Sequence, residues 1–274
     1  MRFVSFNANG IRARLHQLEI ITEKHQPDII ALQETKVADE QFPLEDLQRL
    51  CYPHIDYYGQ KGHYGVALLS RTPARSVQLG LPWRDAEQQR RFIMGTYNVD
   101  GQPVKIINGY FPQGESRDHP IKFPAKRTFY ADVKRYLEEA CDPEEHVLIA
   151  GDMNVAPDDS DIGIGEENQK RWLRTGKTCF LPEERDWLTA LTKWGLSDSY
   201  VDKLEDGERL YSWFDYRSRG FERNPKRGLR IDLILTSRAL ANRIERCGID
   251  YDVRGGDKPS DHCPIWCYFA GSSQ

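Results

Sequence analysis

Residues 147–154, VLIAGDMN, join a short apolar run directly to a polar turn. The four apolar residues are typical of a strand that is buried on both faces. Glycine, aspartate and asparagine all favour tight turns, so the polar end can be explained as a simple connection. It can equally be part of a functional site, because α/β folds place their sites at strand ends.

Seven other segments have the pattern of strands, and amphipathic stretches lie between several of them. The strands are 3–7, 29–32, 66–70, 92–99, 104–110, 231–235 and 264–269, and helical spacing occurs at 11–21, 129–137 and 182–195. Asp100-Gly101 predicts a hairpin between two of the strands. Because strands outnumber helices and hairpins are present, we expect an α/β layered fold with mixed or antiparallel sheets.

The length of 274 residues is sufficient for a complete hydrophobic core, and no linker or repeat marks a boundary. We therefore expect one domain over residues 1–270. Hydrophobic residues make up 39% and charged residues 29%, which excludes a disordered or collagen-like chain. No apolar run approaches the roughly 18 residues of a membrane span. Strand-like sequence begins at the first residues and leaves no room for a signal peptide. We therefore expect no membrane contact and a cytoplasmic protein.

The net charge of −4 gives no overall sign of nucleic-acid binding, but the distribution of basic residues does. Basic groups occur at 122–127, 170–177 and 217–230, and each alone is more easily explained as solvated surface. The aromatic residues interleaved with them are Trp172, Trp213, Phe214, Tyr216 and Phe221. Together, these groups favour a groove that follows a phosphate backbone.

Polar side chains stand at the ends of six of the predicted strands. They are Asn7, Glu34, Asn108, Tyr110, Asp152, Asn154, Asp232, Asp261 and His262. Most have a structural explanation when taken alone: Asn7 can form a turn, and Tyr110 can be a core aromatic. Asp232 is harder to explain in this way, because its apolar neighbours imply a buried charge that needs a partner. We expect these residues to form one convergent cluster.

This set of residue types suits the hydrolysis of a phosphate ester. Glu34, Asp261 and Asn7 offer the hard oxygen ligands that Mg²⁺ or Mn²⁺ prefers, and no cysteine–histidine spacing indicates zinc. Asp232 could fix the tautomer of His262, while Asp152 could accept a proton from water. Serine-hydrolase, Rossmann and P-loop motifs are absent from the sequence.

Several short motifs of the sequence resemble those of a known superfamily. Four short motifs are similar to those of the endonuclease/exonuclease/phosphatase superfamily: Asn7 and the residues 33–35, 151–154 and 260–262. Longer stretches resemble the bacterial exonuclease III group of abasic-site endonucleases: 108–115, 122–126, 171–176, 212–217 and 227–232. The resemblance covers residues 1 to about 269. The loop at Asn224–Lys226 is slightly longer than the pattern of that group.

The resemblance implies a four-layer α/β sandwich, with two face-to-face mixed β-sheets flanked by helices. It implies a monomeric, Mg²⁺-dependent (or Mn²⁺-dependent) enzyme that acts on double-stranded DNA. Such enzymes cleave the phosphodiester 5′ to abasic sites, remove blocking groups from 3′ ends and degrade one strand from its 3′ end.

The resemblance also implies roles for particular residues. Glu34 would hold the metal with Asn7 and Asp261; Asp152 would activate water, and Asn154 would position it. Tyr110 and His262, the latter oriented by Asp232, would contact the scissile phosphate, and the family leaves open whether Asp152 or His262 is the base. The expected DNA-binding residues are Arg91, Gln113 and Lys122 on the backbone, and Trp213, Phe214 and Leu229 around a base-less sugar.

Two other functions remain open on the sequence. One is a DNA-binding module that keeps the fold without the chemistry, which retention of the whole polar set argues against. The other is an enzyme of the same superfamily that hydrolyses a small soluble phosphodiester.

Overall fold

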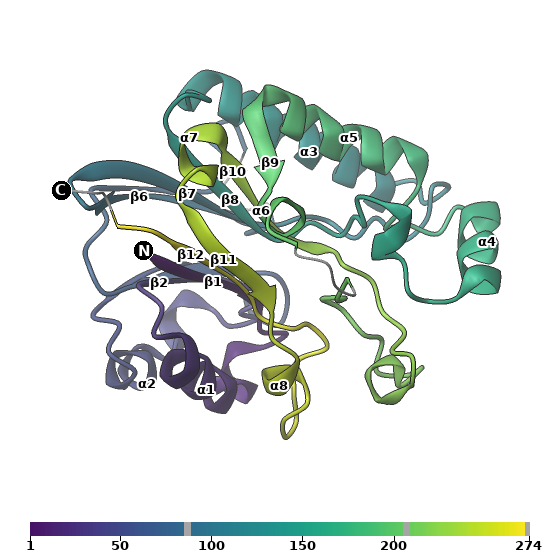
Figure 1. Ribbon diagram of the computed structural model, residues 1–274, viewed down its shortest axis with the longest axis horizontal. Helices are drawn as coiled ribbons and strands as arrows, with labels where there is room; N and C mark the ends of the chain where they lie inside the picture. Colours follow the sequence, from purple (N-terminus) through teal and green to yellow (C-terminus); the bar gives the residue numbers. More distant parts are fainter. Residues whose placement is uncertain (85–88, 205–208, 272–274) are drawn as a thin grey trace.

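The computed structural model describes residues 1–84, 89–204 and 209–271, and it consists of two six-stranded sheets with helices outside them (Figure 1). The first sheet has the strand order β11-β12-β1-β2-β4-β3, and the second has the order β5-β6-β7-β8-β10-β9. Each sheet contains one parallel pair, β1 with β2 and β7 with β8, among antiparallel neighbours. Both sheets are therefore mixed, as expected.

The strands of the first sheet are β1 (Arg2–Asn7), β2 (Ile29–Gln33), β3 (His54–Tyr58), β4 (Val66–Ser70), β11 (Ile244–Ile249) and β12 (Ile265–Phe269). Those of the second are β5 (Ser76–Leu79), β6 (Phe92–Val99), β7 (Gln102–Tyr110), β8 (His146–Asp152), β9 (Leu196–Asp198) and β10 (Asp232–Ser237). The α-helices are α1 (Leu15–His25), α2 (Leu44–Arg49), α3 (Lys122–Ala140), α4 (Glu166–Thr175), α5 (Pro182–Gly195), α6 (Ser199–Asp202), α7 (Arg238–Ala241) and α8 (Tyr251–Arg254).

Three apolar clusters separate four layers. In β2, Ile29 and Ala31 point into the cluster between the sheets, whereas Ile30 and Leu32 point into a cluster that includes residues of α1 and α2. On the other side, α3 and α5 pack over the second sheet in a third cluster. The four-layer sandwich is thus confirmed, and in Figure 1 α1 and α2 lie on the opposite side of the two sheets from α3 and α5. No helix among the described residues has the length and apolarity to cross a bilayer.

The local predictions are confirmed with shifted boundaries. Asp100 and Gly101 have φ of 52° and 81° and form the two-residue turn between β6 and β7, whose pairing runs to Val99 opposite Gln102. The first helix begins at Leu15, because residues 11–13 form a separate 3₁₀ turn.

The topology brings six strand ends to one edge of the sandwich. In the first sheet, β1 and β2 are parallel and β12 is antiparallel to β1, so the start of β12 lies beside the ends of β1 and β2. In the second sheet, β10 starts beside the ends of the parallel strands β7 and β8. The predicted polar residues at these strand ends are therefore carried to the same edge, except Asn108, which lies two residues before the end of β7.

Asn108, which was expected in the polar cluster, instead connects the two sheets. Its side-chain amide donates hydrogen bonds to the carbonyl oxygens of Leu32 and Ala67, both at 2.9 Å. Its oxygen accepts one from Gln33 Nε2 at 2.7 Å. Asn108 is fully buried, so its amide stabilises the interface between the sheets rather than forming part of a solvent-accessible site.

Gly151 allows β7 and β8 to approach closely just before Asp152. It lies opposite Gly109 and has a φ of +141°. A Cβ on Gly151 would lie 1.9 Å from the carbonyl oxygen of Gly109. Since the obstacle is backbone, a larger residue could be accommodated only by moving one of the strands.

We therefore expect Gly151→Ala to lower the free energy of unfolding by about 2–4 kcal/mol, through strand displacement and backbone strain. Gly101→Ala is the matched control, because Gly101 also has a positive φ but nothing lies within 4 Å of its missing Cβ. The control should cost only about 1 kcal/mol. Urea unfolding measures both values, and equal losses would contradict the proposed close approach.

Candidate active site

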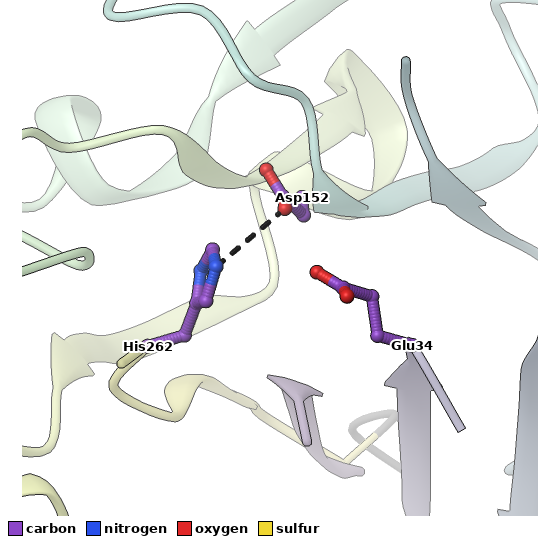
Figure 2. A group of neighbouring side chains, drawn as sticks. All are labelled: Glu34, Asp152 and His262. Atoms are coloured by element: carbon purple, nitrogen blue, oxygen red, sulfur yellow. Dashed lines mark ion pairs between the residues drawn. The ribbon is translucent and has the colours of Figure 1, made fainter. Parts of the chain in front are cut away.

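Three ionisable side chains converge at the shared edge of the two sheets (Figure 2). Glu34 follows β2, Asp152 ends β8, and His262 precedes β12. One potential ligand atom from each lies within 4.8 Å of those of the other two. Figure 2 shows the side chains pointing toward one another, with His262 Nε2 at 3.7 Å from Asp152 Oδ2. The cluster therefore joins residues of both sheets.

Asn7 links the two carboxylates of this cluster. Its side-chain nitrogen donates to Glu34 Oε1 at 2.8 Å and to Asp152 Oδ2 at 3.0 Å. The second oxygen of Glu34 lies 2.9 Å from the ammonium of Lys36. Glu34 has a φ of 50°, a left-handed conformation that turns the chain directly after β2. These contacts hold the carboxylates side by side.

The ring of His262 contacts the carboxylate of Asp232. Its Nδ1 lies 2.8 and 3.1 Å from the two carboxylate oxygens of Asp232, and all of these groups are buried. Ser212 supports the aspartate: its hydroxyl donates to Asp232 Oδ2 at 2.6 Å. The same hydroxyl accepts the backbone N–H groups of residues 231 and 232. The contact on Nδ1 leaves Nε2 of the ring to face Asp152.

Burial and charge shift the proton affinities of these groups. Burial raises the pKa of Asp152, and the negative charges of Asp232 and Glu34 raise it further against the opposing effect of His262. Burial would lower the pKa of His262, but the charges of Asp232 and Asp152 outweigh it and raise that pKa well above 6.5. The imidazole is therefore cationic at neutral pH, which stabilises the buried carboxylates around it.

Asn154 and Tyr110 lie beside Asp152. The backbone N–H of Asn154 donates to Asp152 Oδ1 at 3.0 Å, and its side-chain nitrogen donates to the Phe111 carbonyl at 2.9 Å. Burial, together with the charges of Glu34 and Asp152, raises the pKa of Tyr110 well above 10. Tyr110 thus keeps its proton at neutral pH and can act as a hydrogen-bond donor.

These side chains line one pocket of about 390 Å³. The predicted site residues found in its walls are Glu34, Tyr110, Asp152, Asn154, His262, Asp261, Gln113 and Trp213. Additional residues lining the pocket are Trp172, Lys177, Cys179, Asp215, Arg217 and Ile231. Asn7 and Asp232 are buried behind this surface and act through their hydrogen bonds.

Asp261 lies in the pocket wall but outside the group of three. Its carboxylate accepts hydrogen bonds from Asn9 Nδ2 at 2.8 Å and from Trp213 Nε1 at 3.0 Å. Burial would raise the pKa of Asp261, but the His262 charge and these hydrogen bonds outweigh it and lower that pKa. Asp261 therefore remains charged at the rim of the cluster.

The structure differs from expectation at two apolar residues of the predicted sugar pocket. Phe214 has no exposed surface; its ring packs edge-on against Phe221 and Tyr251, with centroids 5.1 and 5.7 Å away. Leu229 is also fully buried, in a small cluster with Ile231. Both are core residues in this structure, and only Trp213 of the expected trio lines the pocket.

Two of the expected DNA-binding residues also lie outside this pocket wall. Arg91 is almost fully buried, and its guanidinium lies 4.5 Å from the ring centre of Tyr110 and 4.3 Å from that of Tyr64. Arg91 therefore supports Tyr110 from behind. Lys122 is exposed at the start of α3 and pairs with Glu115 at 2.6 Å.

Besides the additional residues of the pocket wall, three residues that support the site through hydrogen bonds or an ion pair were not predicted: Asn9, Lys36 and Ser212. Asn9 and Lys36 lie in the short segments after β1 and β2. Polar residues are common in any loop, so the sequence did not single out these two. Ser212 lies within a motif that was recognised, but a serine has no sequence signal that separates a buried support from a surface hydroxyl.

Comparisons with known proteins agree with this geometry. A model of the endonuclease/exonuclease/phosphatase family matches residues 4–262. Exodeoxyribonuclease III from Haemophilus influenzae is 55% identical over 269 residues, which are 98% of this chain and 100% of that protein. A DNA repair nuclease from Danio rerio is 28% identical, covering 98% of this chain and 82% of its own length.

Two solved structures share the fold over nearly their whole length. A 3′ phosphatase from Neisseria bound to a product DNA hairpin has a TM-score of 0.88 and 33% identity, covering 98% of this chain and 99% of its own. An AP endonuclease from Archaeoglobus fulgidus has a TM-score of 0.87 and 32% identity, with the same coverage. These similarities confirm the resemblance noted in the sequence, and the chain belongs to the endonuclease/exonuclease/phosphatase family.

Proposed function

We propose that this chain is a DNA repair nuclease that hydrolyses the phosphodiester 5′ to abasic sites in double-stranded DNA. We infer that it also degrades DNA from 3′ ends and removes 3′ blocking groups, as the names of its relatives suggest. The observation that carries the proposal is the convergence of Glu34, Asp152 and His262 in one pocket. The core shared by both sheets supports a single catalytic domain over residues 1–270.

The donor set of the pocket fits a hard divalent cation. Glu34 and Asp152 present carboxylate oxygens within 4.8 Å of each other, and oxygen ligands suit Mg²⁺ and Mn²⁺. Asn7 donates hydrogen bonds to both carboxylates, and Asp261 lies in the same pocket wall, so we propose that these two residues complete the set that holds the metal. Such an ion supplies positive charge that stabilises the developing negative charge on a phosphate.

We assign the proton transfer from water to Asp152. Burial raises its pKa and therefore its proton affinity, while the positive charge of His262 opposes that rise and favours the ionised form that can accept a proton. His262 is already protonated at neutral pH, so it is better suited to donate a hydrogen bond to a phosphate oxygen. Asp232 holds the ring in the orientation that this contact requires.

Tyr110 and Asn154 complete the proposed arrangement around the phosphate. The Tyr110 hydroxyl keeps its proton and can donate to a phosphate oxygen. The amide of Asn154, held by the Phe111 carbonyl, can orient the attacking water next to Asp152. Trp213 provides an apolar wall for the sugar, and the neighbouring Phe214, which is fully buried, anchors this segment in the core.

Replacing Glu34 tests the metal assignment. Glu34→Gln removes one ligand charge, so the Mg²⁺ concentration for half-maximal cleavage of an abasic duplex should rise at least about tenfold. Mn²⁺ should restore part of the activity, because it binds such sites more tightly. Glu115→Gln is the control, since this exposed carboxylate lies outside the pocket. An unchanged Mg²⁺ requirement would mean that the ion is held elsewhere.

Replacing Asp152 tests the assignment of the base. Asp152→Asn keeps the shape of the side chain but removes its basicity, so kcat should fall by about 10²–10⁴ while DNA binding is retained. Asp215→Asn removes a carboxylate from the same pocket wall and should have a much smaller effect. Single-turnover rates measure the chemical step, and binding isotherms measure the affinity for DNA. A loss of binding with normal turnover of the bound complex would assign Asp152 to substrate or metal binding instead.

A double-mutant cycle tests the pair formed by Asp232 and His262. If Asp232 acts through the ring, adding Asp232→Ala to His262→Ala should reduce kcat/KM little further. His25→Ala is the matched control, because His25 forms an equally buried pair with Asp250 at 2.7 Å outside the pocket. It should affect the melting temperature rather than turnover of the folded protein. Additive losses in the cycle would show that the two residues act independently.

A further inference from the structure

Two cysteines face each other across neighbouring strands of the first sheet. β11 is an edge strand of that sheet, and β12 lies next to it (Figure 1). Cys247 of β11 and Cys267 of β12 are direct partners in the antiparallel register, so their side chains stand on the same face. Both carry free thiols. Neither lines the active-site pocket, so the proposed chemistry leaves this pair without a role.

The geometry of the pair allows a covalent bond between the two sulfurs. Directly opposed residues of antiparallel strands have Cα atoms about 4.5–5.5 Å apart, and a disulfide needs about 4.4–6.8 Å. The two sulfurs are 2.7 Å apart, compared with roughly 2.0 Å in a disulfide. Bond formation therefore requires a small movement of two side chains and no displacement of either strand.

The two thiols differ in their access to solvent. Cys267 is fully buried, and burial together with the neighbouring Cys247 thiol raises its pKa. Cys247 is half-buried on the edge strand. An oxidant from solution therefore reaches Cys247 first. Cys267 is placed to react second, with a sulfur that already lies against its own.

A link at this position would reinforce an irregular pair of strands. The register of β11 and β12 shifts between Ile244 and Arg246, which leaves one extra residue on β11. Cys247 follows this bulge directly. β12 starts at Ile265, three residues after His262, so the position of the imidazole depends on the pairing of this strand. The link would therefore fix the strand that supports the catalytic cluster.

We propose that Cys247 and Cys267 form a reversible disulfide on contact with a small-molecule disulfide, and that this link stabilises the fold while the active site keeps working. First, the Cys247 thiolate attacks one sulfur of the small disulfide, forms a mixed disulfide and releases one thiolate. Then Cys267 loses its proton, its sulfur attacks Cys247 Sγ, and the second small thiolate leaves. Two protein thiols are thereby oxidised, and one small disulfide is reduced to two thiols.

The test treats the full chain with glutathione disulfide and compares it with the same chain kept in dithiothreitol. Mass spectrometry of peptides identifies which cysteines are joined, and the melting temperature and the cleavage of an abasic duplex are measured on both forms. Cys247→Ser cannot form the link and keeps a side chain of similar size at a half-buried position. Cys51→Ser is the matched control, because Cys51 is exposed and lies outside both strands.

We expect the treated chain to contain peptides joined through Cys247 and Cys267. Its melting temperature should exceed that of the reduced chain by at least about 5 °C, because a link that closes the loop 247–267 restricts the unfolded chain. Dithiothreitol should reverse the shift. Cys51→Ser should show the same shift and Cys247→Ser none, although reduced Cys247→Ser should melt close to the reduced unmodified chain. Cleavage by the linked and reduced chains should differ by less than about twofold.

Three results would overturn the inference: no joined peptides from these two cysteines, a link that leaves the melting temperature unchanged or lowers it, or a loss of cleavage that accompanies the link. A mixed disulfide that stays on Cys247 counts as the first of these. The inference does not rest on the proposed function. If the reduced chain cleaves no abasic duplex, the proposed function fails, whereas the peptide masses and melting temperatures still decide whether the link forms and stabilises the fold.

Discussion

Two buried aspartates face each other across the second sheet, and the active site is arranged around them. Asp152 and Asp232 are direct partners in the antiparallel pair β8 and β10. Like charges in this position repel, and burial makes the repulsion stronger. His262, which precedes β12 of the first sheet, lies against both carboxylates and carries the compensating charge. The relative position of the two sheets is therefore fixed by a charge balance as well as by apolar packing.

This constraint explains why polar groups occur inside the interface between the sheets. Gln33 donates a hydrogen bond to Asn108, whose side-chain nitrogen in turn donates to two backbone carbonyls of the opposite sheet. A purely apolar interface could slide with little penalty, whereas a directional bridge has one favourable register. Gln33 directly precedes Glu34, and Asn108 lies two residues before Tyr110, so a shift of this bridge would also move residues of the site. Gly151 acts at the same level by allowing β7 and β8 to approach each other.

The sequence indicated the interior of both sheets much better than their edges. All eight predicted strands are interior strands, and their apolar runs reflect burial on both faces. The edge strands β3, β5, β9 and β11 were not predicted, because half-exposed strands carry mixed residues without a clear run. In the site, the carboxylates and His262 could be predicted because they stand at the ends of the predicted strands. The sequence could not show that Phe214 is a core residue whereas Trp213 lines the pocket. The two are neighbouring aromatic residues, and only the direction in which the backbone points each ring distinguishes them.

The position of β12 has a consequence for how the active site is completed. This last strand lies between β11 and β1, so it is an interior strand of the first sheet. His262 and Asp261 stand immediately before it and depend on its pairing for their position. Without β12, the first sheet would have a gap between β11 and β1, and the core between the sheets would lack Ile265, Cys267 and Phe269. The active site is therefore completed by the C-terminal part of the described chain, because a chain shortened before His262 would lack the group that balances the two aspartates.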